Sequence, residues 1–241
     1  MDLSGKRVAL ALGGGGARGC AHLGAIDELE ARGAKIVAVA GTSMGALIGG
    51  MYAADQFRPY REWLENLTHR DVLRMLDPAL RSPGLIGADK IMQRVRELIG
   101  DTQIEQLPIP FTAVATELMS GQEVWFQQGS LAHAIRASIA IPSVITPLIE
   151  GERVRVDGGL VDLVPVMPLA SAHADLMVAV SVIGPRQQPE TNPVTLNTLD
   201  VVELSIQTMQ RMITRFQMAS FPPDVYIELP ADICGTMDFH R

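Results

Sequence analysis

The stretch ALGGGGARGCAHLG, residues 11–24, places four consecutive glycines between an apolar run and a helical pattern. The preceding residues 6–12, KRVALAL, are short, apolar and ended by glycine, which predicts a buried strand. Residues 17–33 carry apolar side chains at helical spacing and end at a glycine, which predicts a helix. A glycine loop in this position is typical of anion binding. The anion is either a bound phosphate or an oxyanion that exists only during a reaction.

The same strand–helix pattern repeats directly downstream. Residues 35–41, KIVAVAG, predict a second buried strand, and residues 44–55 predict a helix rich in small side chains. Two such units in succession favour a parallel sheet with right-handed crossovers. The sequence therefore predicts an α/β fold, and 241 residues suffice for a single domain over residues 1–241.

Composition narrows the class of protein. An apolar fraction of 47% favours a well-packed globule, and a net charge of −7 without a basic run disfavours nucleic acid as a partner. Cys20 and Cys234 provide no disulfide framework and are expected to be reduced. No apolar run approaches the ~18 residues of a membrane span, and the N-terminal run is shorter than the roughly 7–15 of a secretory signal. We expect a cytoplasmic protein, with peripheral contact at the inner membrane left open; the oligomeric state is not indicated.

The rest of the chain continues the α/β pattern around one exception. Residues 56–108 predict a helical insertion or cap with a break near Pro83–Gly84. Beyond it we predict strands in 109–118, 123–129, 175–184 and 224–230, a helix over 130–139, and a strand followed by a glycine turn within 153–166.

A second amphipathic segment lies near the end of the chain. Residues 187–195 have the composition of a linker, and residues 199–218 predict a helix. Its apolar side chains form one stripe: Val202, Ile206, Met209, Ile213 and Phe216. We expect this stripe to pack against the sheet, and a lipid-facing role is the alternative.

The glycine loop alone does not decide the function. Gly14 to Gly19 match G-x-G-x-x-G after a strand, which suits a dinucleotide-binding module. That function also needs an acidic residue near the end of the second strand, and residues 36–54 contain none. No Lys-Ser/Thr pair closes the loop either, so a P-loop is disfavoured.

The second strand ends in a different motif. Residues 41–45, GTSMG, match G-x-S-x-G between a strand and a helix, the context of a nucleophile elbow. Consecutive parallel strands end at the same edge of a sheet, so the glycine loop should lie beside Ser43. The backbone N–H groups of Gly14, Gly15 and Gly16 could then form an oxyanion hole for an oxygen bound to Ser43. A tight turn that merely packs is the alternative for this motif.

A serine nucleophile requires a base. The order Ser43, Asp157, His173 mimics the triad of α/β-hydrolases, but His173 lies in a segment that leads into a strand, an ordinary packing or surface position. Asp157 in VRVDGGLVD ends a strand and precedes two glycines, so its carboxylate can reach over the edge of the sheet. We favour Asp157 as the base, with a turn aspartate as the alternative.

The ordered motifs GGGGARG, GTSMG, ASIAIPSVITPL and DGGLVDLVPV resemble the patatin-like phospholipase family, closest to its small single-domain bacterial branch. The resemblance covers roughly residues 6–184. It implies a Ser43–Asp157 dyad without histidine and an oxyanion hole at Gly14, Gly15 and Gly16. It also implies supporting roles for the other motif residues, which are Arg18, Gly19, Gly41, Gly45, Ser138, Pro142, Gly158 and Gly159.

The sequence departs from the family pattern at three places. Gly13 stands where plant patatins have aspartate, and the dyad motif reads D-G-G where D-G-A is frequent. Asp162 and Leu163 stand near a proline where relatives often have asparagine, which can alter the acyl pocket. None of these changes removes a catalytic atom.

We therefore expect a three-layer α/β/α fold with a mainly parallel sheet, and a hydrolase that cleaves carboxylic esters of lipids. No metal or cofactor is implied, and the expected partner is a lipid or ester substrate. The alternatives are a catalytically idle lipid-binding or regulatory protein on the same fold, and a nucleotide-binding module. The sequence does not indicate the acyl length or the head group.

Overall fold

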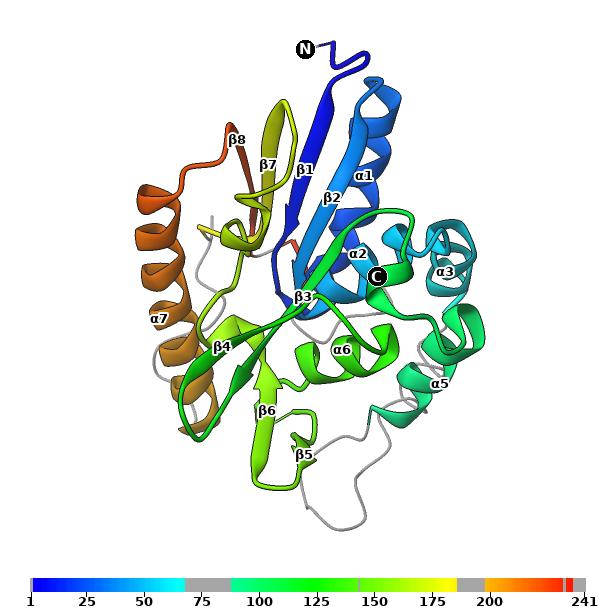
Figure 1. The fold of residues 1–241 in the computed structure, drawn as a ribbon. Coiled ribbons are helices and arrows are strands. Elements are labelled where there is room, and N and C mark those ends of the chain that lie inside the picture. Colours follow the sequence, from blue (N-terminus) through cyan, green and yellow to red (C-terminus); the bar gives the residue numbers. More distant parts are fainter. Residues whose placement is uncertain (1, 68–87, 143, 186–197, 232, 236–241) are drawn as a thin grey trace.

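A computed structural model of the chain describes residues 2–67, 88–142, 144–185, 198–231 and 233–235. Eight strands within these ranges form one mixed sheet (Figure 1). Their bounds are β1 Arg7–Leu12, β2 Lys35–Thr42, β3 Phe111–Glu117, β4 Gln122–Phe126, β5 Leu148–Glu150, β6 Arg153–Asp157, β7 Leu176–Gly184 and β8 Val225–Pro230.

Helices cover both faces of this sheet. The α-helices of the described ranges are α1 Ala21–Ala31, α2 Met44–Ala53, α3 Phe57–Glu65, α5 Asp89–Ile99, α6 Leu131–Ser138 and α7 Thr198–Ser220. Short 3-10 helices are η1 Gly16–Cys20, η2 Ile104–Gln106, η3 Gly158–Leu160 and η4 Met167–Leu169. Among these helices, none has both the length and the apolar character that crossing a membrane would require.

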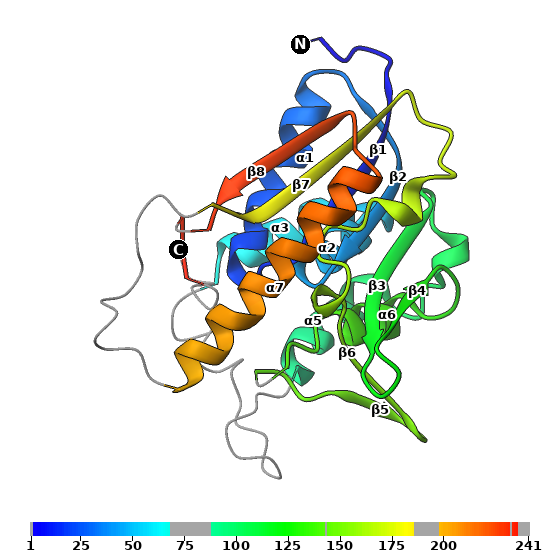
Figure 2. The same cartoon turned by 90° about the vertical axis from the view of Figure 1, so that its left-hand side faces the viewer.

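The sheet order is β5-β6-β3-β2-β1-β7-β8, with β4 paired to β3 outside this path. The pairs that connect β3, β2, β1, β7 and β8 are all parallel, whereas β4 and β6 run antiparallel to β3. Helix α7 lies on one face, and α1, α2, α3, α5 and α6 lie on the other, as the two views show (Figures 1 and 2). The predicted three-layer α/β architecture with a mainly parallel sheet is confirmed.

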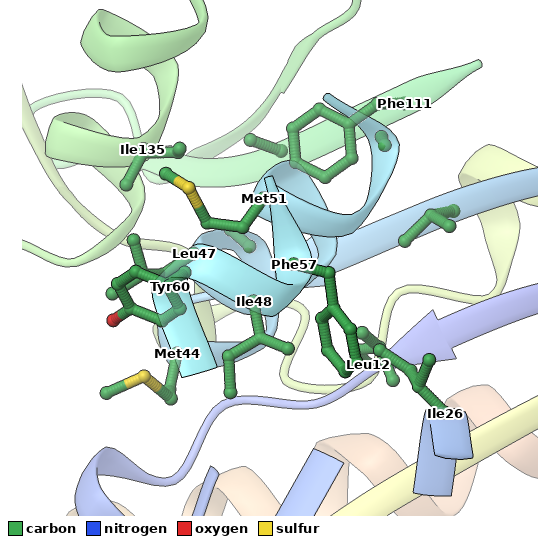
Figure 3. Close-up of a cluster of buried hydrophobic side chains, with 14 of the residues drawn as sticks. Leu12, Ile26, Met44, Leu47, Ile48, Met51, Phe57, Tyr60, Phe111 and Ile135 are labelled. Carbon is green, nitrogen blue, oxygen red and sulfur yellow. The ribbon is translucent and has the colours of Figure 1, made fainter. Parts of the chain in front are cut away.

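The side chains of the central strands point alternately to the two faces of the sheet and pack into two separate cores. Val8, Leu10 and Leu12 of β1 point to the face that carries α1 and α2, whereas Ala9 and Ala11 point to the α7 face. Because side chains on a strand alternate between faces, one strand supplies large residues to one core and small residues to the other. The larger core is the cluster around α2 in Figure 3, where side chains of α2 and α3 meet Leu12, Phe111 and Ile135.

The predicted insertion over residues 56–108 contributes to this larger core. Tyr60 of α3, and Met92 and Val95 of α5, are almost fully buried in the same cluster as α2. The described part of the segment therefore belongs to the helical layer. The break predicted near Pro83–Gly84 and the linker predicted over 187–195 lie outside the described residues.

The structure differs from the sequence prediction in three places. The segment 17–33, predicted as one helix, begins with the 3-10 helix Gly16–Cys20, and α1 covers only Ala21–Ala31. Strand β5, which pairs antiparallel with β6, was not expected because its three residues carry no recognisable period. The prediction for residues 199–218 was correct about the helix and wrong about its packing. Val202, Met209 and Phe216 are exposed, because Gln210, Thr214, Gln217 and Met218 lie on the side of α7 that faces the protein.

Replacing Met92 with alanine should lower the free energy of unfolding by about 2–5 kcal/mol, because a large-to-small change in a packed core leaves a cavity. Urea unfolding followed by circular dichroism measures the change. Arg96 is exposed on the same helix, so Arg96→Ala should shift the free energy of unfolding by less than about 0.5 kcal/mol. An unchanged unfolding transition for Met92→Ala would mean that α5 does not share the main core.

Candidate active site

Ser43 follows the last residue of β2 and caps the start of α2. Its backbone angles are φ 57° and ψ −122°, a conformation that residues with a side chain rarely adopt. Such a turn lifts the side chain above the carboxyl end of the sheet, as in a nucleophile elbow. The sharp strand–helix turn predicted from GTSMG is therefore present in the structure.

Close backbone approach explains the two glycines of this motif. A Cβ atom on Gly41 would lie 2.3 Å from the Gly45 carbonyl oxygen, and one on Gly45 would lie 2.0 Å from the Leu12 carbonyl oxygen. Both distances are far below van der Waals contact. Only glycine at both positions allows α2 to start this close to the ends of β1 and β2.

Ser138, at the end of α6, holds the turn from the other side. The Ser43 N–H donates to Ser138 Oγ at 2.8 Å, and the Ser138 hydroxyl donates to the Val114 carbonyl oxygen at 2.6 Å. All of these atoms are buried, so losing the hydroxyl would leave a buried N–H without an acceptor. Ser138 therefore positions the Ser43 backbone.

Asp157 reaches Ser43 from across β3. In the sheet register Thr42 of β2 lies opposite Val114, and Asp157 of β6 lies opposite Ala115. The Ser43 side chain and the Gly159 N–H, which donates to Asp157 Oδ1 at 2.7 Å, both lower the pKa of the Asp157 carboxyl group. Burial outweighs them and raises this pKa to about 6. The sheet register therefore brings together two residues 114 positions apart in the sequence.

The ASIAIP segment supports Asp157 through its backbone. The Asp157 N–H donates to the Ala140 carbonyl oxygen at 2.9 Å. Pro142 follows as a half-buried residue two positions later. A Cβ atom on Gly158 would lie 2.4 Å from the Val114 carbonyl oxygen, so the chain after the aspartate passes close against β3. Gly159 follows as the hydrogen-bond donor described above.

The glycine loop lies directly against Ser43. A Cβ atom on Gly14 would stand 3.2 Å from Ser43 Cβ. The predicted role of Gly14 as an oxyanion donor needs correction, because its N–H donates to the Leu163 carbonyl oxygen at 2.9 Å. The N–H groups of Gly15 and Gly16 make no hydrogen bond to the described part of the chain. These two donors are the ones that can receive a ligand oxygen.

The other motif residues anchor the loop. Arg18 is buried, and its Nε donates to the Cys234 carbonyl oxygen at 2.8 Å. A Cβ atom on Gly19 would lie 2.3 Å from Met44 Cγ, so glycine is needed where η1 packs against the start of α2. Because Gly16–Cys20 is a 3-10 helix and α1 begins only at Ala21, the loop lacks the direct entry into an α-helix that the dinucleotide alternative requires.

Two further contacts were not found by sequence reasoning. The Thr42 hydroxyl donates to the Asp162 carbonyl oxygen at 2.9 Å, so residues 162 and 163 bind both the elbow and the glycine loop. His22 Nε2 lies 2.7 Å from the Gly13 carbonyl oxygen and donates to it, because a carbonyl oxygen only accepts. The departures noted at Asp162 and Leu163 therefore fall where the two motifs are joined.

His173 does not complete the alternative triad, and His22 has a structural contact. Full burial lowers the pKa of His22 to about 4, and its ring supports the loop. His173 is exposed and lies just before the first residue of β7. Strand β7 runs parallel to β1, and the candidate site lies at the carboxyl end of β1, so His173 lies at the other end of the sheet.

No group of three or more His, Cys, Asp or Glu in the described ranges could hold a metal ion. Cys20 and Cys234 are both unbridged, and burial raises the pKa of Cys20 to about 11.

Residues 10–170 match the family model described as patatin-like phospholipase. The chain belongs to this family, and the predicted membership is confirmed. It is therefore a member of a family of lipid hydrolases.

The chain is also similar to several individual proteins. An uncharacterized NTE family protein of Mycobacterium tuberculosis (strain ATCC 25618 / H37Rv) is 52% identical over 315 aligned positions, which cover 99% of this chain and 88% of the relative. Because 315 positions exceed the 241 residues here, that relative contains segments that this chain lacks. Patatin-like phospholipase domain-containing protein 6 of Mus musculus is 31% identical over 75% of this chain and 14% of its own length. The crystal structure of VipD from Legionella pneumophila matches 89% of this chain and 55% of its own, with 15% identity and a TM-score of 0.45.

The raised pKa of Asp157 predicts a pH-dependent stability. The folded-state value of about 6 lies above the ordinary value, so the folded chain holds the proton more tightly than the unfolded chain. This contribution to stability is fully present below pH ~4 and is lost as the pH rises through ~6. The free energy of unfolding of the wild type relative to Asp157→Asn should therefore fall by about 2–3 kcal/mol between pH 4 and pH 7.

Urea unfolding of both proteins at four pH values across this range measures the difference. A difference that does not change with pH would contradict a buried carboxyl group that titrates near pH 6.

Proposed function

We propose that this protein is a serine lipid acyl hydrolase that cleaves carboxylic esters of lipids, with Ser43 as nucleophile and Asp157 as base. The observation that carries the proposal is the strained turn that sets Ser43 beside the buried carboxyl group of Asp157, whose pKa burial raises to about 6. A base of this strength is largely ionised at neutral pH and basic enough to accept the hydroxyl proton in the transition state. Membership of the patatin-like phospholipase family supports lipid esters as the substrate class.

The first half-reaction forms an acyl-enzyme. Ser43 Oγ attacks the ester carbonyl carbon while its proton passes to Asp157. The oxyanion of the tetrahedral intermediate accepts hydrogen bonds from the Gly15 and Gly16 N–H groups, which have no partner in the described part of the chain. Collapse of the intermediate breaks the ester C–O bond, and the leaving alcohol takes the proton from Asp157.

The second half-reaction regenerates the enzyme. A water molecule gives a proton to Asp157 and attacks the acyl carbon, and the second tetrahedral intermediate uses the same N–H donors. Its collapse returns the proton to Ser43 Oγ and releases the carboxylic acid. Gly14 has a supporting role here, since its hydrogen bond to Leu163 holds the loop against the elbow.

Substitution of the dyad tests the proposal. Ser43→Ala should remain folded and lose both hydrolysis of a short-chain ester and labelling by a fluorophosphonate. Asp157→Asn should lower kcat by about 10²- to 10⁴-fold, the usual contribution of a general base. His173→Ala is the control and should keep wild-type activity, because His173 is exposed at the opposite edge of the sheet.

The opposite outcomes are equally informative. Absence of labelling in the wild type would favour the idle lipid-binding alternative. Loss of activity in His173→Ala as complete as in Asp157→Asn would refute the dyad. Mass spectrometry of acids released from a mixed phospholipid and neutral-lipid panel would then identify the substrate.

Activity should also follow the ionisation of Asp157. Because the base must be deprotonated, kcat/KM should fall tenfold per pH unit below about pH 6 and level off above it. Initial rates on a neutral short-chain ester between pH 4.5 and pH 8 give this profile. A pH-independent rate across this interval would argue against Asp157 as the base.

A further inference from the structure

Helix α7 presents its apolar side chains to solvent. Met209, Met212, Ile213 and Phe216 follow one another at the i, i+3, i+4, i+7 spacing of a single helical face. Met209 is 58% exposed and Phe216 is 66% exposed. Val201 and Val202 extend the exposed set toward the start of the helix.

The side of α7 that contacts the protein carries two glutamines and a buried threonine, together with Met218, which packs against the smaller core. Gln210 Nε2 donates to the Gly159 carbonyl oxygen at 2.9 Å, and Gln217 Nε2 donates to the Val161 carbonyl oxygen at 3.0 Å. Thr214, between them on this side, is buried. The backbone under α7 carries carbonyl groups that need donors, so rotation of the apolar stripe inward would break both bonds and bury those carbonyls unpaired. The outward orientation of the stripe is therefore held by these contacts.

The two ends of α7 differ in charge. Its first turns contain Asp200 and Glu203, whereas residues 204–220, which carry Met209 to Phe216, contain Arg211 and Arg215 and no aspartate or glutamate. Arg215 is exposed beside the apolar stripe. Flexible methionines, one phenylalanine and flanking arginines are the composition of helices that lie in the interface of anionic lipid.

The position of α7 connects this face with the candidate site. Gly159 and Val161, the acceptors of the two glutamine bonds, follow Asp157 by two and four residues. Helix α7 lies across the face of the sheet opposite α1 and α2, so no other described helix covers it (Figure 2). A lipid surface that contacts α7 would therefore lie beside the loop that carries the candidate base.

We propose that the outward face of the basic C-terminal part of α7, formed by Met209, Met212, Ile213 and Phe216, docks on an anionic lipid surface. The choice of lipid as the occupant rests on the proposed function. The helix then lies parallel to the surface with its apolar side chains among the acyl chains and its arginines at the phosphate level.

Vesicle binding tests the docking face separately from catalysis. The full chain carrying Ser43→Ala, which leaves lipid intact under the proposed function, is sedimented with vesicles of phosphatidylglycerol and phosphatidylcholine. Phe216→Gln in this background should weaken binding roughly 10- to 100-fold, the loss expected when an aromatic side chain leaves lipid. Ile149→Gln is the matched control, because Ile149 is 67% exposed on β5, and it should change binding by less than about twofold.

A separate variant tests the contribution of the arginines to vesicle binding. Arg211→Gln with Arg215→Gln should weaken binding to the anionic vesicles at least about fivefold and leave binding to pure phosphatidylcholine unchanged. All of these positions are at least partly exposed, and circular dichroism together with the thermal midpoint checks that each variant is folded.

Several results would overturn the proposal. The first is that the parent chain does not bind vesicles, and the second is that Phe216→Gln and Ile149→Gln lose equal amounts of vesicle binding. The third is a dimer, seen in analytical ultracentrifugation, that Phe216→Gln dissociates. In the last case a second copy of the chain, and not lipid, covers the face. Hydrolysis of a water-soluble ester by the wild type without vesicle binding would refute the docking face alone, and vesicle binding without hydrolysis would refute the proposed function alone.

Discussion

The backbone conformation of Ser43 is the constraint on which the rest of the site depends. A positive φ at a serine costs free energy, and the residues around Ser43 offset that cost. Gly41 and Gly45 remove the side chains that would collide at the turn, and Ser138 accepts the Ser43 N–H. The resulting turn points the Ser43 hydroxyl at Asp157 while the glycine loop lies against its Cβ.

Residues 158–163 join the parts of this site through their backbone. Leu163 and Asp162 accept hydrogen bonds from the glycine loop and from Thr42, and Gly159 donates to the Asp157 carboxylate. Gly159 and Val161 in turn accept from α7. One short segment thus connects the proposed nucleophile, the proposed base, the glycine loop and the helix with the exposed apolar face. Displacement of α7 would act first on this segment.

Helix α7 explains why an amphipathic pattern does not reveal which side is buried. The stripe at Met209, Ile213 and Phe216 satisfies the spacing of a core-facing helix, and the packing prediction made from it was wrong. The polar side is buried because the carbonyl groups of residues 159 and 161 require donors, and glutamine side chains supply them. Only the fold discloses that this helix lies over irregular backbone.

The sequence by itself determined the α/β class, the order of the elements and the residue types of the site, because these follow from local periodicity and from glycines at turns. It also indicated that Ser43 and the glycine loop share one edge of the sheet, since parallel neighbours end together. The tertiary structure decided that Gly14 gives its N–H to Leu163, that His22 supports Gly13, and that α7 turns its apolar side outward. The Gly14 and α7 contacts depend on hydrogen-bond partners distant in sequence, and His22 meets Gly13 only once the loop between them is folded. The partner of a polar group is set only when the chain is folded.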